Sequence, residues 1–251
     1  MIIEAREASL QAGAAYIEGI HSLGSPTPFE PLTRLLRFQW RRGSWLLSGA
    51  LSRGAKSFVD VTLGAAALVA LIPFFLVVAA LIKLSDPGGP VLFWQTRVGK
   101  HGRHFAFPKF RSMKVDAEAE IEQLAGENLN DGSITFKMED DPRVTRLGRV
   151  IRKASLDELP QLWCVLTGEM SLVGPRPPLP REVARYSSAQ RRRLDVVPGL
   201  TCIWQVSGRS NIPFDGQVVM DVEYIETQSL WLDLKLLLKT IPAVLNGRGA
   251  Y

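Results

Sequence analysis

The segment VTLGAAALVALIPFFLVVAALI, residues 61–82, is the longest stretch of the chain without a charged side chain. At about 1.5 Å per residue, a helix of this length is roughly as long as the hydrocarbon core of a bilayer is thick. It begins too far into the chain, and is too long, to be the apolar part of a signal peptide. The segment therefore predicts a helix inserted in a membrane.

Hydropathy alone favours an ordinary spanning helix, but a proline and the flanking charges favour a different path. Pro73 lies in the middle of the segment, where it removes a backbone hydrogen bond and bends the helix. Basic residues, which prefer the cytoplasmic face, flank the segment on both sides. They are Arg34, Arg37, Arg41, Arg42, Arg53 and Lys56 before it, and Lys83, Arg97, Lys100, Arg103, Lys109, Arg111 and Lys114 after it. We therefore expect a re-entrant membrane helix over residues 56–85 that is kinked at Pro73 and enters and leaves on one side.

Residues 1–55 are expected to form an N-terminal extension that is amphipathic in part. The stretch FEPLTRLLRFQWRRGSWLLSGALSRGAK (29–56) mixes Leu, Phe and Trp with arginines, which suits a helix lying on a membrane surface. The net charge of +5 and the isoelectric point of about 9.4 indicate an anionic partner: nucleic acid, an anionic membrane or a phosphorylated substrate. The two cysteines, Cys164 and Cys202, form no metal cluster or disulfide framework, which favours a reducing compartment.

Residues 86–251 are expected to form a compact catalytic domain, so that the fold class is α+β, mainly helical, with short strands and amphipathic surface helices. Apolar and aromatic runs broken by glycine predict a β-hairpin in residues 91–113. Arginines three residues apart in 142–155 predict a helix with a basic stripe, either a solvated face or a surface for phosphate or anionic lipid. Further predicted elements are a helix over 116–126, a rigid loop at 173–180, a strand-like stretch at 198–210, and an amphipathic helix over 229–245 interrupted by Pro242.

The stretch KASLDELPQLW, residues 153–163, places two carboxylates side by side, Asp157 and Glu158. One interpretation is structural: Ser155 is the N-cap of a helix, and Glu158 bonds back to its amide as in a capping box. The other is chemical, because the free N–H groups and positive dipole of a helix start can hold a phosphate. The two interpretations are compatible with each other.

Several ordered motifs resemble the bacterial sugar transferases, the monotopic phosphoglycosyl transferases that act on polyprenol phosphate. These motifs are PVLFWQTRVGKHGRHFAFPKFRSM, DPRVTRLGRVIRKASLDELPQLWCVLTGEMSLVGPRP, PGLTCIWQVSGR and SLWLDLKLLLKT. The resemblance runs from about Lys56 to the C-terminal residues and does not cover residues 1–55. It implies a re-entrant helix broken by a proline, which matches Pro73. It also implies that Asp157 is the nucleophile, that Glu158 is its acid/base partner, and that Mg²⁺ binds beside Asp157.

The resemblance further implies transfer of a sugar 1-phosphate from a UDP-sugar to polyprenol (undecaprenyl) phosphate, giving polyprenyl diphosphosugar and UMP. A carboxylate can displace UMP and form a covalent phosphosugar-enzyme once cations have cancelled the phosphate charge. The cations in family motifs are Lys109, Arg111, Arg152, Arg176 and Arg209, each either a phosphate ligand or a salt-bridge partner. The expected location is the bacterial inner membrane, with membrane lipid around the helix and the catalytic domain on the cytoplasmic face.

Two other functions would use the same features. A membrane-anchored phosphohydrolase would also form an aspartyl-phosphate but would need no lipid acceptor. A non-catalytic scaffold on the membrane surface would keep the basic faces, and the dyad would only cap a helix. Nucleic-acid binding rests on charge alone and has no motif here, so no nucleic acid is expected. The sequence does not name the sugar, for which we expect a hexose such as glucose or galactose, and it leaves homo-oligomer formation open.

Overall fold

The computed structural model describes residues 30–115, 117 and 141–246. The chain forms two units, Met1–Gly54 and Ala55–Tyr251. Every element described below belongs to the second unit, apart from the first part of the long helix that begins at Glu30. The helix predicted over residues 116–126 lies almost wholly outside the described residues.

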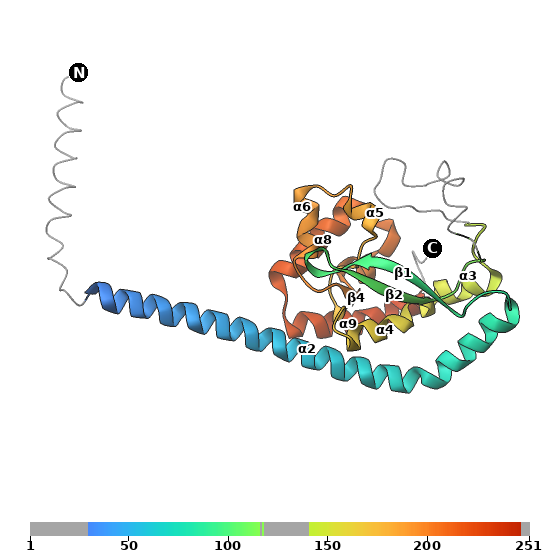
Figure 1. Cartoon of the computed structure of the whole chain (residues 1–251), viewed down its shortest axis with the longest axis horizontal. Helices are drawn as coiled ribbons and strands as arrows, with labels where there is room; N and C mark the ends of the chain where they lie inside the picture. Colours follow the sequence, from blue (N-terminus) through green and yellow to red (C-terminus); the bar gives the residue numbers. More distant parts are fainter. Residues whose placement is uncertain (1–29, 116, 118–140, 247–251) are drawn as a thin grey trace, which may run out of the picture. The chain divides into compact units, whose positions relative to one another are not determined.

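Helix α2 (Glu30–Ser85) contains the predicted membrane segment and is continuous through Pro73. Its part from Leu51 to Ser85 is long and apolar enough to cross a membrane. Figure 1 shows α2 bending in its C-terminal half, the half that contains Pro73, as expected where a proline interrupts backbone hydrogen bonding. Large apolar side chains are exposed along this half, among them Leu63, Val69, Ile72, Leu76, Val77 and Leu81. An apolar surface of this extent is typical of a segment that contacts lipid.

One narrow stripe of α2 packs against the rest of the second unit. Its members are Ala67, Leu68 and Leu71 on the main core, and Phe74, Phe75, Val78 and Ile82 in a second cluster. The three- and four-residue spacings are those of one helix face. In the second cluster, Phe75 meets Phe110 edge to face, with ring centroids 5.5 Å apart. The membrane segment therefore has one face on the domain along most of its length, while its other faces are open.

The predicted hairpin is confirmed. Strand β1 (Leu92–Val98) pairs antiparallel with β2 (His104–Phe110), in a register that places Leu92 opposite Phe110 and Val98 opposite His104. A short 3-10 turn, η1 (Lys100–Gly102), joins the strands. Gly102 has a φ of 80°, which glycine adopts without steric cost. On β2, Phe105 and Phe107 alternate as buried residues and face the main core.

A second, two-stranded sheet is parallel and very short. It consists of β3 (Ser171–Val173) and β4 (Gly199–Thr201). The strand-like stretch predicted at 198–210 is therefore wrong beyond Thr201, because the chain enters helix α7 (Ile203–Ser207) two residues later. Ile203 and Val206 both pack on the main core, and their three-residue spacing fits a helix rather than the two-residue period of a strand.

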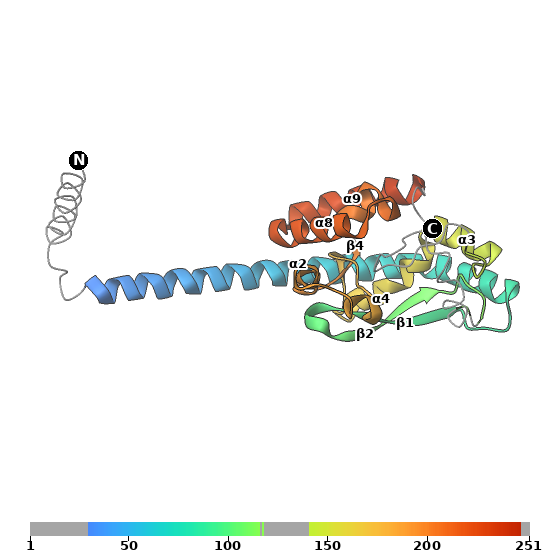
Figure 2. The same cartoon turned by 90° about the horizontal axis from the view of Figure 1, so that it is seen from above.

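The remaining elements are helical, so that the α+β, mainly helical fold class is confirmed. They are α3 (Arg146–Lys153), η3 (Leu156–Gln161), α4 (Leu162–Leu166), α5 (Pro180–Val183), α6 (Ser188–Arg191), η4 (Arg192–Leu194), η5 (Arg209–Asn211), α8 (Phe214–Thr227) and α9 (Leu230–Asn246). Helix α9 continues through Pro242 rather than stopping there. In Figure 2, α8 and α9 lie on one side of the domain and the β1–β2 hairpin on the other.

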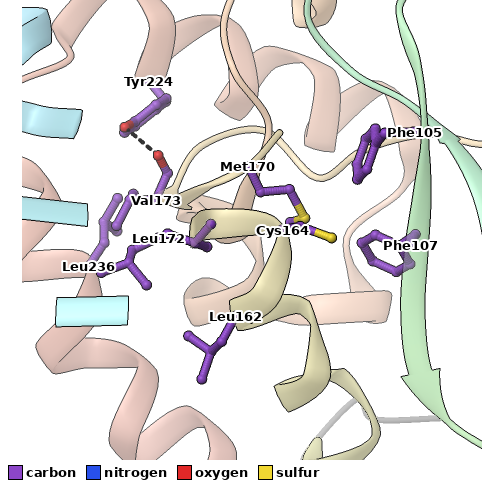
Figure 3. Close-up of a cluster of buried hydrophobic side chains, with 10 residues drawn as sticks. Phe105, Phe107, Leu162, Cys164, Met170, Leu172, Val173, Tyr224 and Leu236 are labelled. Carbon is purple, nitrogen blue, oxygen red and sulfur yellow. Dashed lines mark hydrogen bonds between the residues drawn. The ribbon is translucent and has the colours of Figure 1, made fainter. Parts of the chain in front are cut away.

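The main core joins these layers. Its buried residues are Phe105, Phe107, Leu162, Cys164, Val165, Met170, Leu172, Val173, Tyr224 and Leu236. Figure 3 shows Phe105 and Phe107 on the hairpin side of this cluster and Tyr224 on the helical side, where its hydroxyl bonds to the Val173 carbonyl. The core thus fixes β2, α4 and β3 relative to one another, and these elements flank the carboxylate pair.

Candidate active site

The two carboxylates lie on η3, a 3-10 helix between α3 and α4. The preceding Ser155 has a left-handed backbone, with φ 54° and ψ 24°, and its side chain makes no capping hydrogen bond. The capping box expected from the sequence is therefore wrong. An N-cap residue needs an extended backbone to direct its side chain onto the helix, and Ser155 does not have one. The carboxylate of Glu158 instead bonds to cations from other segments.

Glu158 is held by Arg176 and Lys109. The Arg176 guanidinium donates through Nη1 to Oε2 at 3.0 Å and through Nη2 to Oε1, in a two-point pair. Lys109 Nζ lies 3.4 Å from Oε1. Burial acts to raise the pKa of Glu158, but the charges of Arg176 and Lys109 outweigh it and hold the pKa well below its usual range. Glu158 is therefore a fixed anion at neutral pH.

Asp157 differs sharply from its neighbour. Its side chain is buried, with 7% of its surface exposed, and it makes no hydrogen bond or ion pair with any of the described residues. Burial raises the pKa of Asp157, the charge of Glu158 raises it further, and Lys109, Arg152 and Arg176 act against this rise. One carboxylate of the pair is thus fully engaged, whereas the other is available to a ligand.

Lys109 reaches the pair from strand β2. Its ammonium group lies 5.4 Å from the centroid of the Phe107 ring, which gives it a cation–π contact. Burial lowers the pKa of Lys109 to about 8, although the nearby Glu158 acts in the opposite direction. Lys109 therefore changes its charge close to physiological pH.

Arg176 reaches the pair from the loop that was predicted at 173–180 and that follows β3. Strand β1 holds this loop, because Val98 N donates to Pro178 O at 2.9 Å and Arg97 Nη1 donates to Pro177 O at 3.0 Å. Pro175 and Pro177, on either side of Arg176, are fully buried. The two rigid prolines and the bonds to β1 thus fix where the guanidinium points.

Arg97 is a residue of the site that motif reasoning missed. Burial, and after it the charge of Arg176, lower the pKa of Arg97 to about 10. Its guanidinium also lies 5.1 Å from the centroid of the Phe107 ring, the same ring that Lys109 contacts. The sequence did contain a signal for this residue, because Gln95 and Arg97 are two positions apart in a predicted strand and so lie on the same face. Their side chains bond in the structure, with Arg97 Nη2 2.8 Å from Gln95 Oε1.

Of the other predicted cations, Arg152 and Arg209 lie near the carboxylate pair, whereas Arg111 does not. Arg152 donates through Nε to Ser112 Oγ at 3.1 Å, and its charge acts on Asp157. Arg209 makes no side-chain hydrogen bond or ion pair in the described part of the chain. Burial lowers the pKa of Arg209, with Arg176 adding to this effect and Glu158 opposing it.

Arg111 is the predicted cation that bonds elsewhere. It leaves the hairpin just after β2 ends, and its guanidinium lies 3.4 Å from the Asp86 carboxylate and also bonds to the Asp86 carbonyl. The structure therefore places Arg111 at the turn that follows α2 and not beside the dyad. Asp141 pairs with Arg143 in a tight turn, in which Val144 N donates to the Asp141 carbonyl at 3.1 Å.

The donor set around Asp157 fits Mg²⁺. No group of three or more metal-binding side chains occurs among the described residues. Both oxygens of Glu158 are occupied by cations, so within the described part of the chain Asp157 is the carboxylate of the pair that has no bonded partner. Mg²⁺ usually keeps several waters and is bound by one or two carboxylates together with substrate phosphates. A single carboxylate beside a phosphate site matches that preference.

The site as a whole is built for a strongly anionic ligand. Two carboxylates are surrounded by more cationic groups than are needed to neutralise them, and these cations are Arg97, Lys109, Arg152, Arg176 and Arg209. Arg176 keeps donors beyond the two that Glu158 takes, since a guanidinium has five N–H groups. A diphosphate can therefore bind while Glu158 stays in place.

The chain belongs to the bacterial sugar transferase family, whose sequence model matches residues 51–247. The family resemblance stated from the motifs is thereby confirmed. This match includes the whole candidate site and the membrane segment of α2.

Individual relatives are similar over the same region. CpsE, a galactosyl transferase of Streptococcus agalactiae, is 49% identical over 198 residues, which cover 78% of this chain and 43% of CpsE. The exopolysaccharide production protein ExoY of Sinorhizobium fredii is 42% identical over 200 residues, covering 78% of this chain and 88% of ExoY. An undecaprenyl-phosphate galactose phosphotransferase of Salmonella typhimurium is 40% identical over 203 residues, covering 80% and 42%. The matched region is thus less than half of CpsE and of the Salmonella protein.

Proposed function

We propose that this protein transfers a sugar 1-phosphate from a UDP-sugar to undecaprenyl phosphate through a covalent intermediate on Asp157. The observation that carries the proposal is the buried carboxylate of Asp157, which has no hydrogen-bond or ion-pair partner among the described residues, beside a Glu158 that is held by Arg176 and Lys109. The names of relatives support it, since they include a UDP-galactose-lipid carrier transferase and an undecaprenyl-phosphate galactose phosphotransferase. A hexose 1-phosphate is the group transferred.

In the first step, an Asp157 oxygen attacks the phosphorus that carries the sugar. A bond forms between this oxygen and phosphorus, the bond from phosphorus to the bridging oxygen breaks, and UMP leaves with the electron pair. Arg176, Lys109 and Arg209 bind phosphate oxygens and reduce the repulsion between the carboxylate and the diphosphate. Mg²⁺, when bound beside Asp157, supplies further neutralising charge to the phosphates.

In the second step, the phosphate of the lipid attacks the same phosphorus, and Asp157 leaves as a carboxylate. Neither nucleophile has a proton to lose, because one is a carboxylate and the other a phosphate anion. Both steps therefore balance without a proton shuttle. The low pKa of Glu158 fits this chemistry, since a permanent anion serves better as a holder of Arg176 and Lys109 than as the acid/base expected from the family resemblance.

The packing of α2 supports the re-entrant topology. Near the start of the apolar segment, Asp60 Oδ2 accepts a hydrogen bond from Ser171 Oγ at 2.7 Å, and near its end Val78 and Ile82 pack against Phe110. A spanning helix would put these two ends on opposite sides of the membrane, some 30 Å apart. Because both ends contact one folded domain, we place them on the same side, the cytoplasmic face of the inner membrane where UDP-sugars are found.

The decisive experiment separates the two steps. Purified protein with a UDP-hexose and Mg²⁺, but no lipid, should release about one equivalent of UMP and gain one hexose phosphate in intact-protein mass spectrometry. Peptide mapping should place the added mass on Asp157. Undecaprenyl phosphate should then restore continuous turnover. Continuous UMP release without lipid would indicate a phosphohydrolase, and the absence of any adduct under rapid quench would exclude the covalent route.

A further inference from the structure

A buried polar network joins the membrane helix to the short strand that leads to Arg176. Lys56, on α2, places its Nζ 2.7 Å from Asp233 Oδ2, 3.4 Å from Asp60 Oδ2 and 3.3 Å from the carbonyl oxygen of Val173. The side chains of Lys56 and Asp233 are 15% and 8% exposed, so the ion pair is largely shielded from water.

A second donor reaches the same carbonyl. The Tyr224 hydroxyl lies 2.9 Å from Val173 O and 2.7 Å from Asp233 Oδ1, so one proton is shared between two acceptors (Figure 3 shows the bond to Val173). Asp233 therefore orients both groups that bind Val173 O, namely the Lys56 ammonium and the Tyr224 hydroxyl. The last carbonyl of β3 is thereby held from two elements, α2 and α8.

The other end of β3 is tied to α2 as well. Asp60 accepts hydrogen bonds from Ser171 Oγ at 2.7 Å and from Leu172 N at 3.4 Å. Strand β3 has only three residues and pairs with a partner of the same length, so its own ladder contributes little to its position. Its register against the membrane helix depends instead on these side-chain bonds.

Arg176 follows Val173 by three residues, and the chain between them is stiff. Pro175 is buried, Gly174 N donates to Thr201 O at 3.0 Å, and strand β1 holds the carbonyls of Pro177 and Pro178. A shift at Val173 would therefore move the Arg176 guanidinium instead of being absorbed by the loop. The Lys56–Val173 hydrogen bond and the stiff backbone from Val173 to Arg176 thus form one short path from the membrane helix to the phosphate-binding arginine.

We propose that Lys56 and Asp233 are positioning residues that fix Arg176 relative to the membrane helix, and so set the phosphate site at a defined place relative to the bilayer. This inference rests on the proposed function. A buried ion pair seldom adds net stability, because desolvation offsets the attraction, whereas it does define one arrangement of the groups around it. The lipid phosphate and the nucleotide phosphate must meet at one phosphorus, and a fixed offset between α2 and Arg176 meets that need.

The test compares Lys56→Met with Lys83→Met. Lys83 lies on the same helix and bonds only to the backbone carbonyls of Pro87 and Gly89 in the described part of the chain, so it is a matched control. The amplitude of the lipid-free UMP burst counts active molecules, and its rate reports the chemistry. We expect Lys56→Met to slow the burst by roughly tenfold to a hundredfold at nearly full amplitude. Lys83→Met should match wild type, and Lys56→Arg should recover most of the rate.

A second readout does not depend on activity. Hydrogen exchange in detergent should become faster in peptides covering residues 171–176 of Lys56→Met, with the β1–β2 hairpin unchanged. Asp233→Asn, which keeps the side-chain shape, should reproduce both effects and serves if Lys56→Met folds poorly. A burst of lower amplitude but normal rate, or unchanged exchange at residues 171–176, would overturn the positioning role. If wild type forms no adduct, the proposed function fails, and the exchange result still decides the coupling.

Discussion

The carboxylate of Glu158 accepts hydrogen bonds from both terminal nitrogens of Arg176, eighteen positions further along the chain, while the adjacent Asp157 has no such partner in the described structure. The pKa values of these two neighbouring carboxyl groups are thus shifted in opposite directions. Cations hold the pKa of Glu158 well below its usual range, and burial raises that of Asp157. Environments that shift the pKa values of two neighbouring carboxyl groups in opposite directions are typical of active sites where each group has its own role.

Replacing Asp157 by Asn should abolish turnover and adduct formation yet make the protein more stable at neutral pH. The folded-state pKa of Asp157 lies above the unfolded value, so the folded protein binds this proton more tightly. Its contribution to stability is therefore present at low pH and is lost as the pH rises through the folded-state pKa. Removing the buried charge should raise the free energy of unfolding at pH 7 by about 0.5–2 kcal/mol.

Chemical denaturation at pH 7 and again at pH 4 checks this prediction. The gain should shrink at the lower pH, because a larger fraction of the wild-type carboxyl group is then protonated. Asp195→Asn, at an exposed position, is the control and should change neither stability nor activity. A variant that is inactive and also clearly less stable would indicate that Asp157 has a structural role instead.

Replacing Glu158 by Gln should destabilise the protein, in contrast to what a capping role predicts. Glutamine would preserve a capping box, so the sequence alone predicts a change of about 1 kcal/mol or less. In the structure the substitution leaves Arg176 and Lys109 without their buried anion, and we expect a loss of about 1.5–3 kcal/mol. In a double-mutant cycle with Arg176→Gln, the two losses should be far from additive. Additive losses would show that the pair does not couple.

The sequence predicts those parts of this fold that depend on local pattern. The apolar run of α2 and the hairpin around β1 and β2 follow from hydropathy, periodicity and turn residues. The partners of Glu158 do not, because Lys109 and Arg176 come from distant segments that only the folded core brings together. A four-residue pattern cannot show that a glutamate will bond to remote cations rather than to its own helix start.

The same limit explains the cations that were misplaced or missed. Arg111 lies two residues after Lys109, and an uninterrupted strand would place both side chains on one face. Strand β2 ends at Phe110, however, and the chain turns so that Arg111 meets Asp86. Arg97 was noted in the sequence only as a charge flanking the membrane segment, since its bond to Pro177 O depends on a loop eighty residues away.

Arg209 and Arg111 give a matched pair of opposite predictions. Arg209 has a left-handed backbone with φ 53° and no side-chain partner among the described residues. Arg209→Gly should therefore stabilise the protein by roughly 1 kcal/mol while lowering kcat/KM for the UDP-sugar about tenfold to a hundredfold. Arg111→Ala should do the reverse, with lower stability and normal kinetics per folded molecule. Unfolding curves and burst-normalised kinetics decide between them; normal kinetics in Arg209→Gly would remove this arginine from the site.

The pH profile of kcat/KM should contain an alkaline limb that is caused by deprotonation of Lys109. Its pKa of about 8 implies that the ammonium charge is lost in mildly alkaline solution, so kcat/KM for the UDP-sugar should fall above about pH 8. Lys109→Arg keeps a positive charge throughout this range and should move the fall to higher pH. Between about pH 8 and 10.5, Lys109 is protonated in the unfolded chain but not in the folded protein. The contribution of Lys109 to the free energy of unfolding therefore increases as the pH rises through this range. Activity should thus decline without unfolding, and an unshifted limb in Lys109→Arg would assign it to another group.

Both ends of the apolar part of α2 should react with a water-soluble maleimide from the cytoplasmic side only. Gly54→Cys and Ser85→Cys place single reporters at exposed positions before and after the segment, and Cys164 and Cys202 are buried and should stay silent in the wild-type control. Ser187→Cys, exposed on the domain, marks the side on which the domain lies. The expectation follows from the packed stripe of α2, which would have to separate from Phe110 and Ser171 before either end could cross the bilayer. Labelling of Gly54→Cys and Ser85→Cys from opposite faces of sealed vesicles would contradict the re-entrant topology, and with it the meeting of a membrane lipid and a cytoplasmic nucleotide at Asp157.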